Sequence, residues 1–213
     1  MSEVEALYPF LFDQRVDLAP VIDQVTRSTA EKAQQIVALR AEIGERYGTL
    51  LADCAKALAA AFTDGAKLLC FGNGGSSSDA SAVATTFVHP PHGRPLPATS
   101  LTGDVCALTA LANDVGYEVV FSRQIAAWGR PGDIALGLST SGGSANVLHA
   151  FEEARRRGMI SVGFAGYDGG KMAEADTIDY LFTIPSSSVH RIQEGQTTTY
   201  HVLWELVQAE LRD

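Results

Sequence analysis

The sequence predicts an α/β fold in which a doubly wound, five-stranded parallel sheet follows an N-terminal helical extension. Five short apolar runs, at residues 68–71, 98–101, 134–138, 160–165 and 180–184, alternate with segments whose apolar spacing suits helices. The runs lack the alternation of half-exposed strands, and uninterrupted apolar strands are typical of parallel sheets covered on both faces. Right-handed crossovers then place a ligand crevice at the carboxyl ends of the strands, where the strand order reverses.

The helices of this pattern are expected at residues 77–89, 105–127, 144–157, 171–175 and 190–212. From Val16 to Phe62 apolar residues recur at intervals of three and four, which predicts an amphipathic helix, interrupted near Gly44 or Gly48. No residue in this stretch suggests chemistry. Residues 1–64 are therefore interpreted as a helical extension for packing and oligomerisation, and residues 65–213 as the ligand-binding domain. Residues 1–15 are either poorly ordered or packed on a partner.

The composition excludes several classes of function. A net charge of −9 over 213 residues argues against a broad nucleic-acid or anionic-membrane surface. The N-terminus is acidic and lacks the basic segment of a secretory signal, and no window is apolar enough to span a bilayer. Cys54, Cys70 and Cys106 are widely spaced, which fits reduced thiols rather than disulfides or a metal site. We therefore expect a cytoplasmic protein with a small ligand and no direct nucleic-acid or membrane partner.

Two turns rich in glycine and hydroxyl groups follow predicted strands. The first, Gly72-Asn73-Gly74-Gly75-Ser76, leads into a helix, an arrangement that presents backbone N–H groups to an anion. A purely structural turn explains this stretch equally well on its own. The second runs from Ser139 to Ser144 before another helix, and its hydroxyls at Ser139, Thr140, Ser141 and Ser144 exceed what helix capping requires. Side-chain hydroxyls and free amides at a helix start predict a phosphate site that needs no lysine.

Two nucleotide-binding alternatives fail on specific residues. A dinucleotide fingerprint requires a third glycine where this chain has Ser77, and an acidic residue where the second strand ends in Thr99-Ser100-Leu101. A Walker loop requires Gly-Lys-Ser or Gly-Lys-Thr, which the sequence does not contain.

Seven motifs in this order resemble the sugar isomerase (SIS) domain of the phosphoheptose isomerase family. They are Gly72-Asn73-Gly74-Gly75-Ser76, Leu111-Ala112-Asn113-Asp114, Phe121-Ser122-Arg123-Gln124, Gly129-Arg130-Pro131-Gly132-Asp133, Ser139-Thr140-Ser141-Gly142, Asp168-Gly169-Gly170-Lys171 and Arg191-Ile192-Gln193-Glu194. The resemblance covers residues 45–210. It implies a flavodoxin-like sheet, a homotetramer with sites shared between subunits, and a sugar-phosphate ligand.

The same resemblance assigns the ligand-binding residues. It implies that the phosphate is bound by Ser139, Thr140, Ser141 and Ser144. It implies that the sugar chain is lined by Asn73, Gly74, Gly75, Ser76, Asn113, Asp114 and Gln193.

The acid–base residues of the family are only partly present. Its isomerases carry a His and, four residues later, a Glu on the helix after the glycine turn, and these positions are Ala82 and Thr86 here. Gln196 stands where isomerases commonly have another His, whereas His201 matches a family site position and is the candidate acid/base. The alternative for His201 is a histidine packed on an apolar helix. Some relatives bind zinc, but Ala82 and Thr86 replace two of its ligands, so no cofactor and no metal are expected.

Enediol isomerisation requires a base near the substrate carbon, and a threonine hydroxyl is far too weak an acid to replace a carboxylate. His89 and His92 lie in a proline-rich loop and are interpreted as surface residues, although a subunit interface could bring them to a neighbouring site. Arg94, Glu118 and Glu194 are further candidates without a preferred role.

Three functions stay open. The chain is a phosphoheptose-isomerase-like enzyme, a catalytically silent sugar-phosphate sensor or scaffold that regulates a protein partner, or a purely structural oligomer. One branch of the family associates with a bacterial replication initiator, which gives the scaffold a precedent. The hydroxyl-rich turn at Ser139 argues against the structural oligomer. The residues favour sugar-phosphate binding over turnover.

Overall fold

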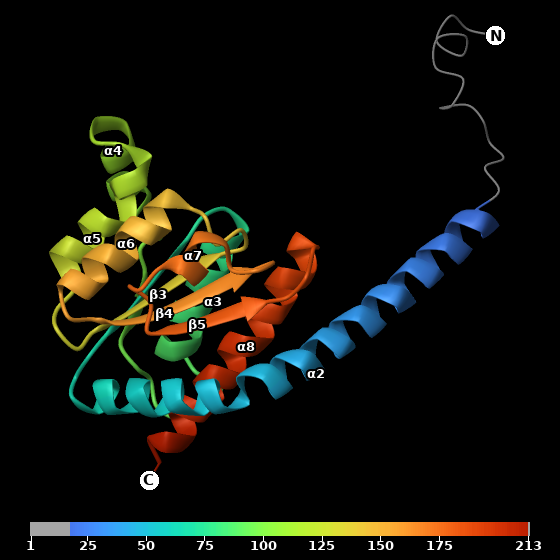
Figure 1. Ribbon diagram of the computed structural model, residues 1–213, viewed down its shortest axis with the longest axis horizontal. Coiled ribbons are helices and arrows are strands. Elements are labelled where there is room, and N and C mark those ends of the chain that lie inside the picture. The colour runs from blue at the N-terminus through green and yellow to red at the C-terminus, as the bar shows by residue number, and fades with distance from the viewer. Residues whose placement is uncertain (1–17, 213) are drawn as a thin grey trace, which may run out of the picture. The chain divides into compact units, whose positions relative to one another are not determined.

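The computed structural model of the protein describes residues 18–212, so the expectation for residues 1–15 falls outside the described part. In chain order the elements are α2 (Ala19–Thr63), β1 (Leu68–Gly72), α3 (Gly75–Val88), β2 (Ala98–Ser100), α4 (Val105–Asp114), η2 (Tyr117–Val119), α5 (Val120–Trp128), β3 (Ile134–Ser139), α6 (Ala145–Arg156), β4 (Ile160–Gly166), α7 (Gly170–Glu174), β5 (Tyr180–Ile184) and α8 (Val189–Glu210) (Figure 1).

The strands form one parallel sheet in the order β2-β1-β3-β4-β5, which confirms the predicted flavodoxin-like, doubly wound fold. The order reverses between β1 and β3, whose residues pair from Leu68 with Ile134 to Gly72 with Leu138. Every residue of these two strands is buried, as expected for central strands of a covered parallel sheet. The carboxyl ends of β1 and β3 therefore lie side by side, with the two hydroxyl-rich turns just beyond them.

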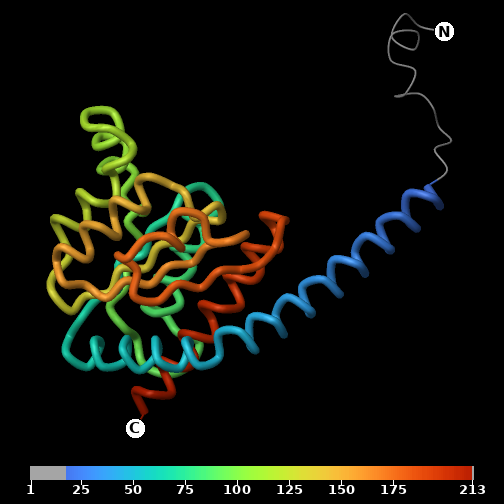
Figure 2. Tube along the Cα trace, viewed as in Figure 1, coloured from blue at the N-terminus to red at the C-terminus, as the bar shows by residue number. Residues whose placement is uncertain are grey.

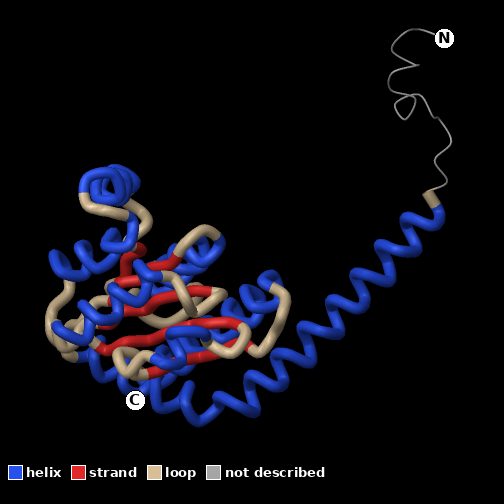
Figure 3. Tube along the Cα trace, turned by 45° about the horizontal axis from the view of Figure 1, so that its top comes forward, coloured by secondary structure: helices blue, strands red, loops and turns tan. Residues whose placement is uncertain are grey.

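Helices cover both faces of the sheet (Figure 3). On one face α3 packs on β1, β2 and β3, α8 packs on β4 and β5, and the two helices pack on each other. Figure 2 shows α8, in red, on the same side of the sheet as α3, in green. On the other face α6 packs on β3 and β4 and also on α5. Phe71 and Phe151 meet there with ring centroids 5.3 Å apart. Gly137 of β3 makes room for both rings, because a Cβ at this position would lie 2.6 Å from each.

The chain divides into two units, residues 1–38 and 39–213. In the first, the described residues are Leu18 and the start of α2, and exposed apolar side chains occur at Leu18, Val21, Ile22, Val25 and Val37. In the second, the remainder of α2 contributes Leu39, Ile43 and Leu51 to the buried core. Tyr47 fixes this part of the helix to the edge strand β5, because its hydroxyl bonds to both the N–H and the carbonyl of Thr183 at 3.0 Å.

Two predictions about helix boundaries are wrong. α2 is continuous through Gly44 and Gly48, because helical glycine costs only about 1 kcal/mol relative to alanine and the buried side chains around it outweigh that cost. The single helix predicted at 105–127 is instead α4, η2 and α5. Gly116, with φ of 132°, turns the chain between them in a conformation that other residues rarely adopt.

Candidate functional site

The glycine turn (Gly72–Ser76) connects β1 to α3. Gly72 must be glycine, because a Cβ there would lie 2.7 Å from the Ser76 carbonyl oxygen and 2.9 Å from that of Leu138. Gly74 has a positive φ of 55° and precedes the first residue of α3. A side chain at Gly75 would collide with the amide of Gln193. The turn therefore lies against α8, which brings Gln193 next to the residues predicted to accompany it.

The side chain of Asn73 is held by two residues that the sequence analysis missed. Asn73 and Asn146 exchange two amide hydrogen bonds, both 2.8 Å long. The hydroxyl of Tyr117 donates a third hydrogen bond to Asn73 Oδ1, at 3.0 Å. The Asn73 amide is thus engaged with protein atoms, and it links the glycine turn to α6 and η2. Asn146 could have been identified from its place in the first turn after Ser144, whereas Tyr117 carried no sequence signal.

The serine turn (Ser139–Ser144) connects β3 to α6, and its hydroxyl groups converge. Ser139 Oγ lies 3.0 Å from Ser144 Oγ and 3.4 Å from Ser141 Oγ, and Ser141 Oγ accepts the N–H of Gly143 at 3.2 Å. Ser139 is buried, Thr140 and Ser144 are half-buried, and Ser141 is exposed. Three hydroxyls and the start of α6 can therefore surround one small anion, which would replace the hydrogen bonds that the serines now make to each other.

Asn113 and Asp114 lie at the end of α4, and both side chains are exposed. Asn113 donates to Asp114 Oδ1 at 2.7 Å. No residue of α4 is buried, and the helix packs on η2 and α5. Among the predicted sugar-binding residues, Asn113 and Asp114 are exposed, as are Gly74 and Gly75.

The α3–α8 face comprises Ala82 and Thr86 of α3 and Gln193, Thr197 and His201 of α8. Thr86 donates its hydroxyl to the Ala82 carbonyl at 2.9 Å, and Thr197 donates to the Gln193 carbonyl at 2.9 Å. His201 is exposed, and its Nδ1 lies 2.8 Å from the Thr197 carbonyl. With the proton on Nδ1, the other ring nitrogen of neutral His201 is an acceptor. His201 is thus not enclosed in a packed core, although its ring contacts Tyr200 with centroids 4.8 Å apart.

Asp79, on α3, is a carboxylate of this region that the sequence analysis did not single out. The Tyr200 hydroxyl lies 3.5 Å from Asp79 Oδ1, and Asp79 Oδ2 is buried with no hydrogen-bond partner among residues 18–212. Burial raises the pKa of Asp79, while the nearby hydroxyl groups of Tyr200 and Thr197 partly offset that rise. Burial also raises the pKa of Tyr200. Asp79 is the one acidic residue of α3, so it is the carboxyl group that this helix offers to the α3–α8 face.

Gln196 faces the interior of the same region. Its side chain is fully buried, and neither its amide nitrogen nor its amide oxygen has a partner within the described chain. Gln196 therefore differs from Gln193, which reaches the glycine turn.

The loop that follows α3 is fixed to the end of α8. Arg94 and Gln208 exchange two hydrogen bonds of 3.0 Å between the Arg94 backbone and the Gln208 amide. The exposed His92 ring packs on Trp204, with centroids 4.8 Å apart. His89 is also exposed. The loop thus lies on the surface of this chain, as the sequence indicated.

The residues at the α3–α8 face do not fit a zinc site. Gln193 and His201 are the two ligand types present at the matched positions, and the Thr86 hydroxyl is already bonded to the backbone. Zinc requires at least three protein ligands drawn from thiolate, imidazole and carboxylate groups, or their close equivalents. No group of three or more His, Cys, Asp or Glu side chains within residues 18–212 is arranged to hold a metal ion.

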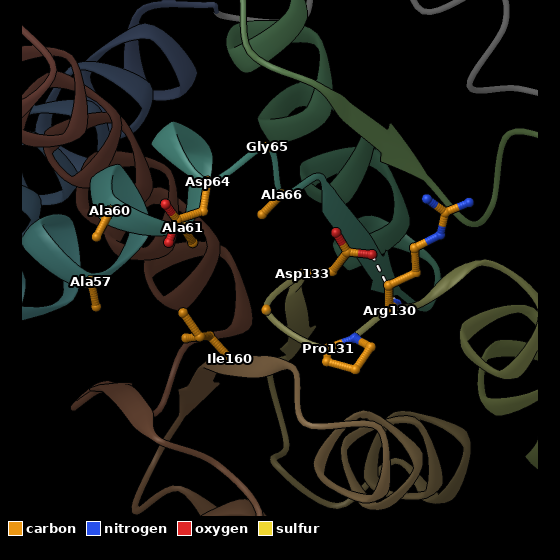
Figure 4. Close-up of a pocket in the computed structure, with 11 residues that line it drawn as sticks. Ala57, Ala60, Ala61, Asp64, Gly65, Ala66, Arg130, Pro131, Asp133 and Ile160 are labelled. Atoms are coloured by element: carbon orange, nitrogen blue, oxygen red, sulfur yellow. Dashed lines mark hydrogen bonds between the residues drawn. The ribbon is translucent and has the colours of Figure 1, made fainter.

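A pocket of about 550 Å³ lies at the other end of β3, beside the residues that precede this strand (Figure 4). Its wall includes Asp133, whose carboxylate accepts the backbone N–H groups of Lys67 and Arg130 at 2.9 Å and pairs with the Lys67 ammonium at 2.5 Å. These contacts use the carboxylate to fix the starts of β1 and β3. The opposite wall is formed by small residues of α2, among them Ala57, Ala60 and Ala61. The pocket is therefore separate from both hydroxyl-rich turns.

Within residues 18–212, none of the helices has the length and apolarity that crossing a bilayer demands.

Comparison with known proteins agrees with this geometry. The family model of the SIS domain matches residues 33–166. The phosphoheptose isomerase of Aquifex aeolicus (strain VF5) is 43% identical over 184 residues, which are 84% of this chain and 95% of that protein. The phosphoheptose isomerase of Roseiflexus sp. (strain RS-1) is 41% identical over 193 residues, 89% of this chain and 96% of that protein.

Solved structures of the same family superpose over most of the chain. Phosphoheptose isomerase from Neisseria gonorrhoeae gives a TM-score of 0.79 at 33% identity, covering 87% of this chain and 99% of that one. The enzyme from Francisella tularensis gives 0.81 at 29% identity, covering 87% and 98%. Similarity of this extent, over nearly the full length of the relatives, settles membership: the chain belongs to the SIS domain proteins of the phosphoheptose isomerase family.

Proposed function

We propose that the protein binds a phosphorylated sugar of the sedoheptulose 7-phosphate type, with the phosphate in the serine turn and the sugar chain along the glycine turn towards α8. The observation that carries this proposal is the convergence of Ser139, Ser141 and Ser144 beside the glycine turn. The phosphoheptose isomerase relatives, by their names, act on a ligand of this kind. Hydroxyl donors and a helix N-terminus suit a phosphate monoester without any positively charged side chain.

The same residues favour binding over ordinary turnover. Interconversion of a ketose and an aldose removes a proton from one carbon and returns it to the next, which needs a base and an acid near the sugar oxygens. Thr86 and Ala82 cannot supply the base. His201 is the candidate acid/base at the matched position of the face, and the carboxyl group on α3 is Asp79, whose Oδ1 lies 3.5 Å from the Tyr200 hydroxyl. We therefore place a catalytically silent sugar-phosphate sensor or scaffold beside the isomerase as the second candidate function.

The exposed α4 supports an assembled form. Asn113 and Asp114 belong to the predicted sugar site, yet no residue of their helix is buried in one chain. We propose that a homotetramer completes the site by covering α4, as the resemblance implies. We also propose a cytoplasmic location, which the free thiols of Cys54, Cys70 and Cys106 support.

The two candidate functions are separated by assaying the full-length protein with sedoheptulose 7-phosphate, with and without added zinc. For the sensor or scaffold, we expect the ligand to raise the melting temperature without turnover in either condition. For the isomerase, we expect turnover that disappears in His201→Ala. If the sugar phosphate neither stabilises the protein nor is converted, the proposed function is wrong.

A further inference from the structure

The hydroxyl of Tyr117 connects a peripheral segment to the centre of the proposed site. It donates to Asn73 Oδ1 at 3.0 Å, and the same oxygen accepts the Asn146 amide at 2.8 Å. Asn146 is buried, with 3% of its surface exposed, and lies in the first turn of α6, two residues after the serine turn ends at Ser144. One side chain, Asn73, thereby joins the glycine turn, the helix that follows the serine turn, and η2.

The segment that Tyr117 belongs to is weakly anchored. From Thr102 to Val119 no residue is buried. Leu108, Leu111 and Ala112 are partly buried against the core, and His149 Nδ1 lies 3.1 Å from the Glu118 carbonyl. The hydroxyl of Tyr117 makes a side-chain hydrogen bond from this segment to the glycine turn. η2 packs on α6 and α5, and because segments with few buried side chains open more readily than the core, the bond from Tyr117 adds to a small set of anchoring contacts.

Tyr117 lies three residues after Asp114, and Gly116 stands between them. The φ of Gly116 is 132°, and a Cβ there would lie 2.7 Å from the Glu118 carboxylate. The N–H groups of Val115 and Gly116 both bond to the Leu111 carbonyl, at 3.0 and 3.1 Å, and the Val119 N–H bonds to the Gly116 carbonyl at 3.4 Å, so backbone hydrogen bonds hold the path from Asp114 to Tyr117. Fixing the Tyr117 hydroxyl consequently fixes where α4 ends, and with it Asn113 and Asp114.

We propose that Tyr117 is a positioning residue for the sugar end of the site. By bonding to Asn73 it holds Asn113 and Asp114 in register with the glycine turn, and half of its own surface remains exposed at the rim. The proposal rests on the sugar-phosphate function given above and deepens it, because it separates the sugar end of the site from the phosphate end. Tyr117 contributes nothing to the serine turn, whose hydroxyls bond to one another.

The test removes only the hydroxyl. Tyr117→Phe keeps the ring, and Tyr180→Phe, at the amino end of β5, is the matched control. Affinities of the full-length protein for sedoheptulose 7-phosphate and for inorganic phosphate are measured by calorimetry. We expect Tyr117→Phe to weaken the sugar phosphate about three- to tenfold, as for one hydrogen bond, while inorganic phosphate changes by less than about twofold. The control and the melting temperature stay unchanged.

A double-mutant cycle shows whether Tyr117 acts through Asn73. In an Asn73→Ala background, Tyr117→Phe is expected to have no further effect on sugar-phosphate affinity, since its partner is gone. Additive losses in the cycle would overturn the proposal. So would equal losses for the two ligands, or an unchanged sugar-phosphate affinity in Tyr117→Phe. If the unaltered protein binds neither ligand, the proposed function itself fails, and this outcome is distinct from the other three.

Discussion

The serine turn and the α3–α8 face are built in different ways, although they belong to one proposed site. The serine turn comes from six consecutive residues, and its hydroxyls satisfy one another. The α3–α8 face requires two helices that are distant in sequence, and it contains a buried carboxylate oxygen of Asp79 and a buried Gln196 amide without partners among the described residues. Unpaired buried polar groups reduce stability, so the two regions also differ energetically.

This difference separates binding from chemistry. A phosphate can exchange for the hydrogen bonds within the serine turn without any rearrangement of the fold. The acid–base function depends on particular side chains at Ala82 and Thr86, which are apolar or bonded to the backbone. Under the proposed function, ligand binding and acid–base chemistry therefore depend on different residues. Fold and family membership alone consequently say little about turnover.

The largest effect is expected from the serine turn. Ser139→Ala combined with Ser141→Ala removes two hydroxyl donors to a charged ligand, each contributing about 1.5 kcal/mol or more, so affinity for sedoheptulose 7-phosphate should fall at least about 100-fold. Calorimetry measures the affinity, and Thr63→Ala, whose hydroxyl bonds to the Ala59 carbonyl, is the control. If the double variant binds as tightly as the unaltered protein, the phosphate is not held by the serine turn.

The next largest effect is expected at the α3–α8 face, when positions 82 and 86 receive the residues that the isomerases carry there. Ala82→His with Thr86→Glu adds an imidazole and a carboxylate one helical turn apart, near Gln193 and His201. Four ligand types then meet the requirement for zinc, and affinity for zinc should rise at least about tenfold over the unaltered protein. Equilibrium dialysis measures it, and the same double change with His201→Ala should lose the gain. Unchanged zinc binding would show that the two helices do not present one site.

The sequence predicted the parts of the molecule that depend on local patterns. Each strand lies within two residues of its apolar run, and the two turns meet at one edge because β1 and β3 are neighbours. The continuity of α2 through Gly44 and Gly48 was missed, because tertiary packing outweighs the low helix propensity of glycine. The sequence analysis also missed the roles of Asn146, Tyr117 and Asp79, because their partners are distant in sequence and only the folded chain brings them together.

A smaller effect concerns stability. Gln196→Leu replaces a fully buried amide, which lacks partners among residues 18–212, by an apolar side chain of similar size. The free energy of unfolding should increase by about 1 kcal/mol, because the desolvation cost of the amide disappears. Urea denaturation at constant m-value measures the change. A loss of stability would mean that Gln196 has a polar partner in the assembled protein.

The smallest effect is the pH dependence that Asp79 contributes. Because burial raises the pKa of this carboxyl group, the folded protein binds a proton more tightly than the unfolded chain does. Stability is therefore favoured at low pH, and it decreases as the pH rises from the unfolded pKa through the folded pKa. Asp79→Asn removes this dependence while keeping an acceptor for Tyr200. Its melting temperature should exceed that of the unaltered protein by about 1–2 °C at pH 7, with the difference vanishing towards pH 3. The effect stays small because Asp79 as a residue is only half-buried, so nearby solvent screens its charge. A difference of the opposite sign at pH 7 would mean that ionised Asp79 stabilises the contact between α3 and α8.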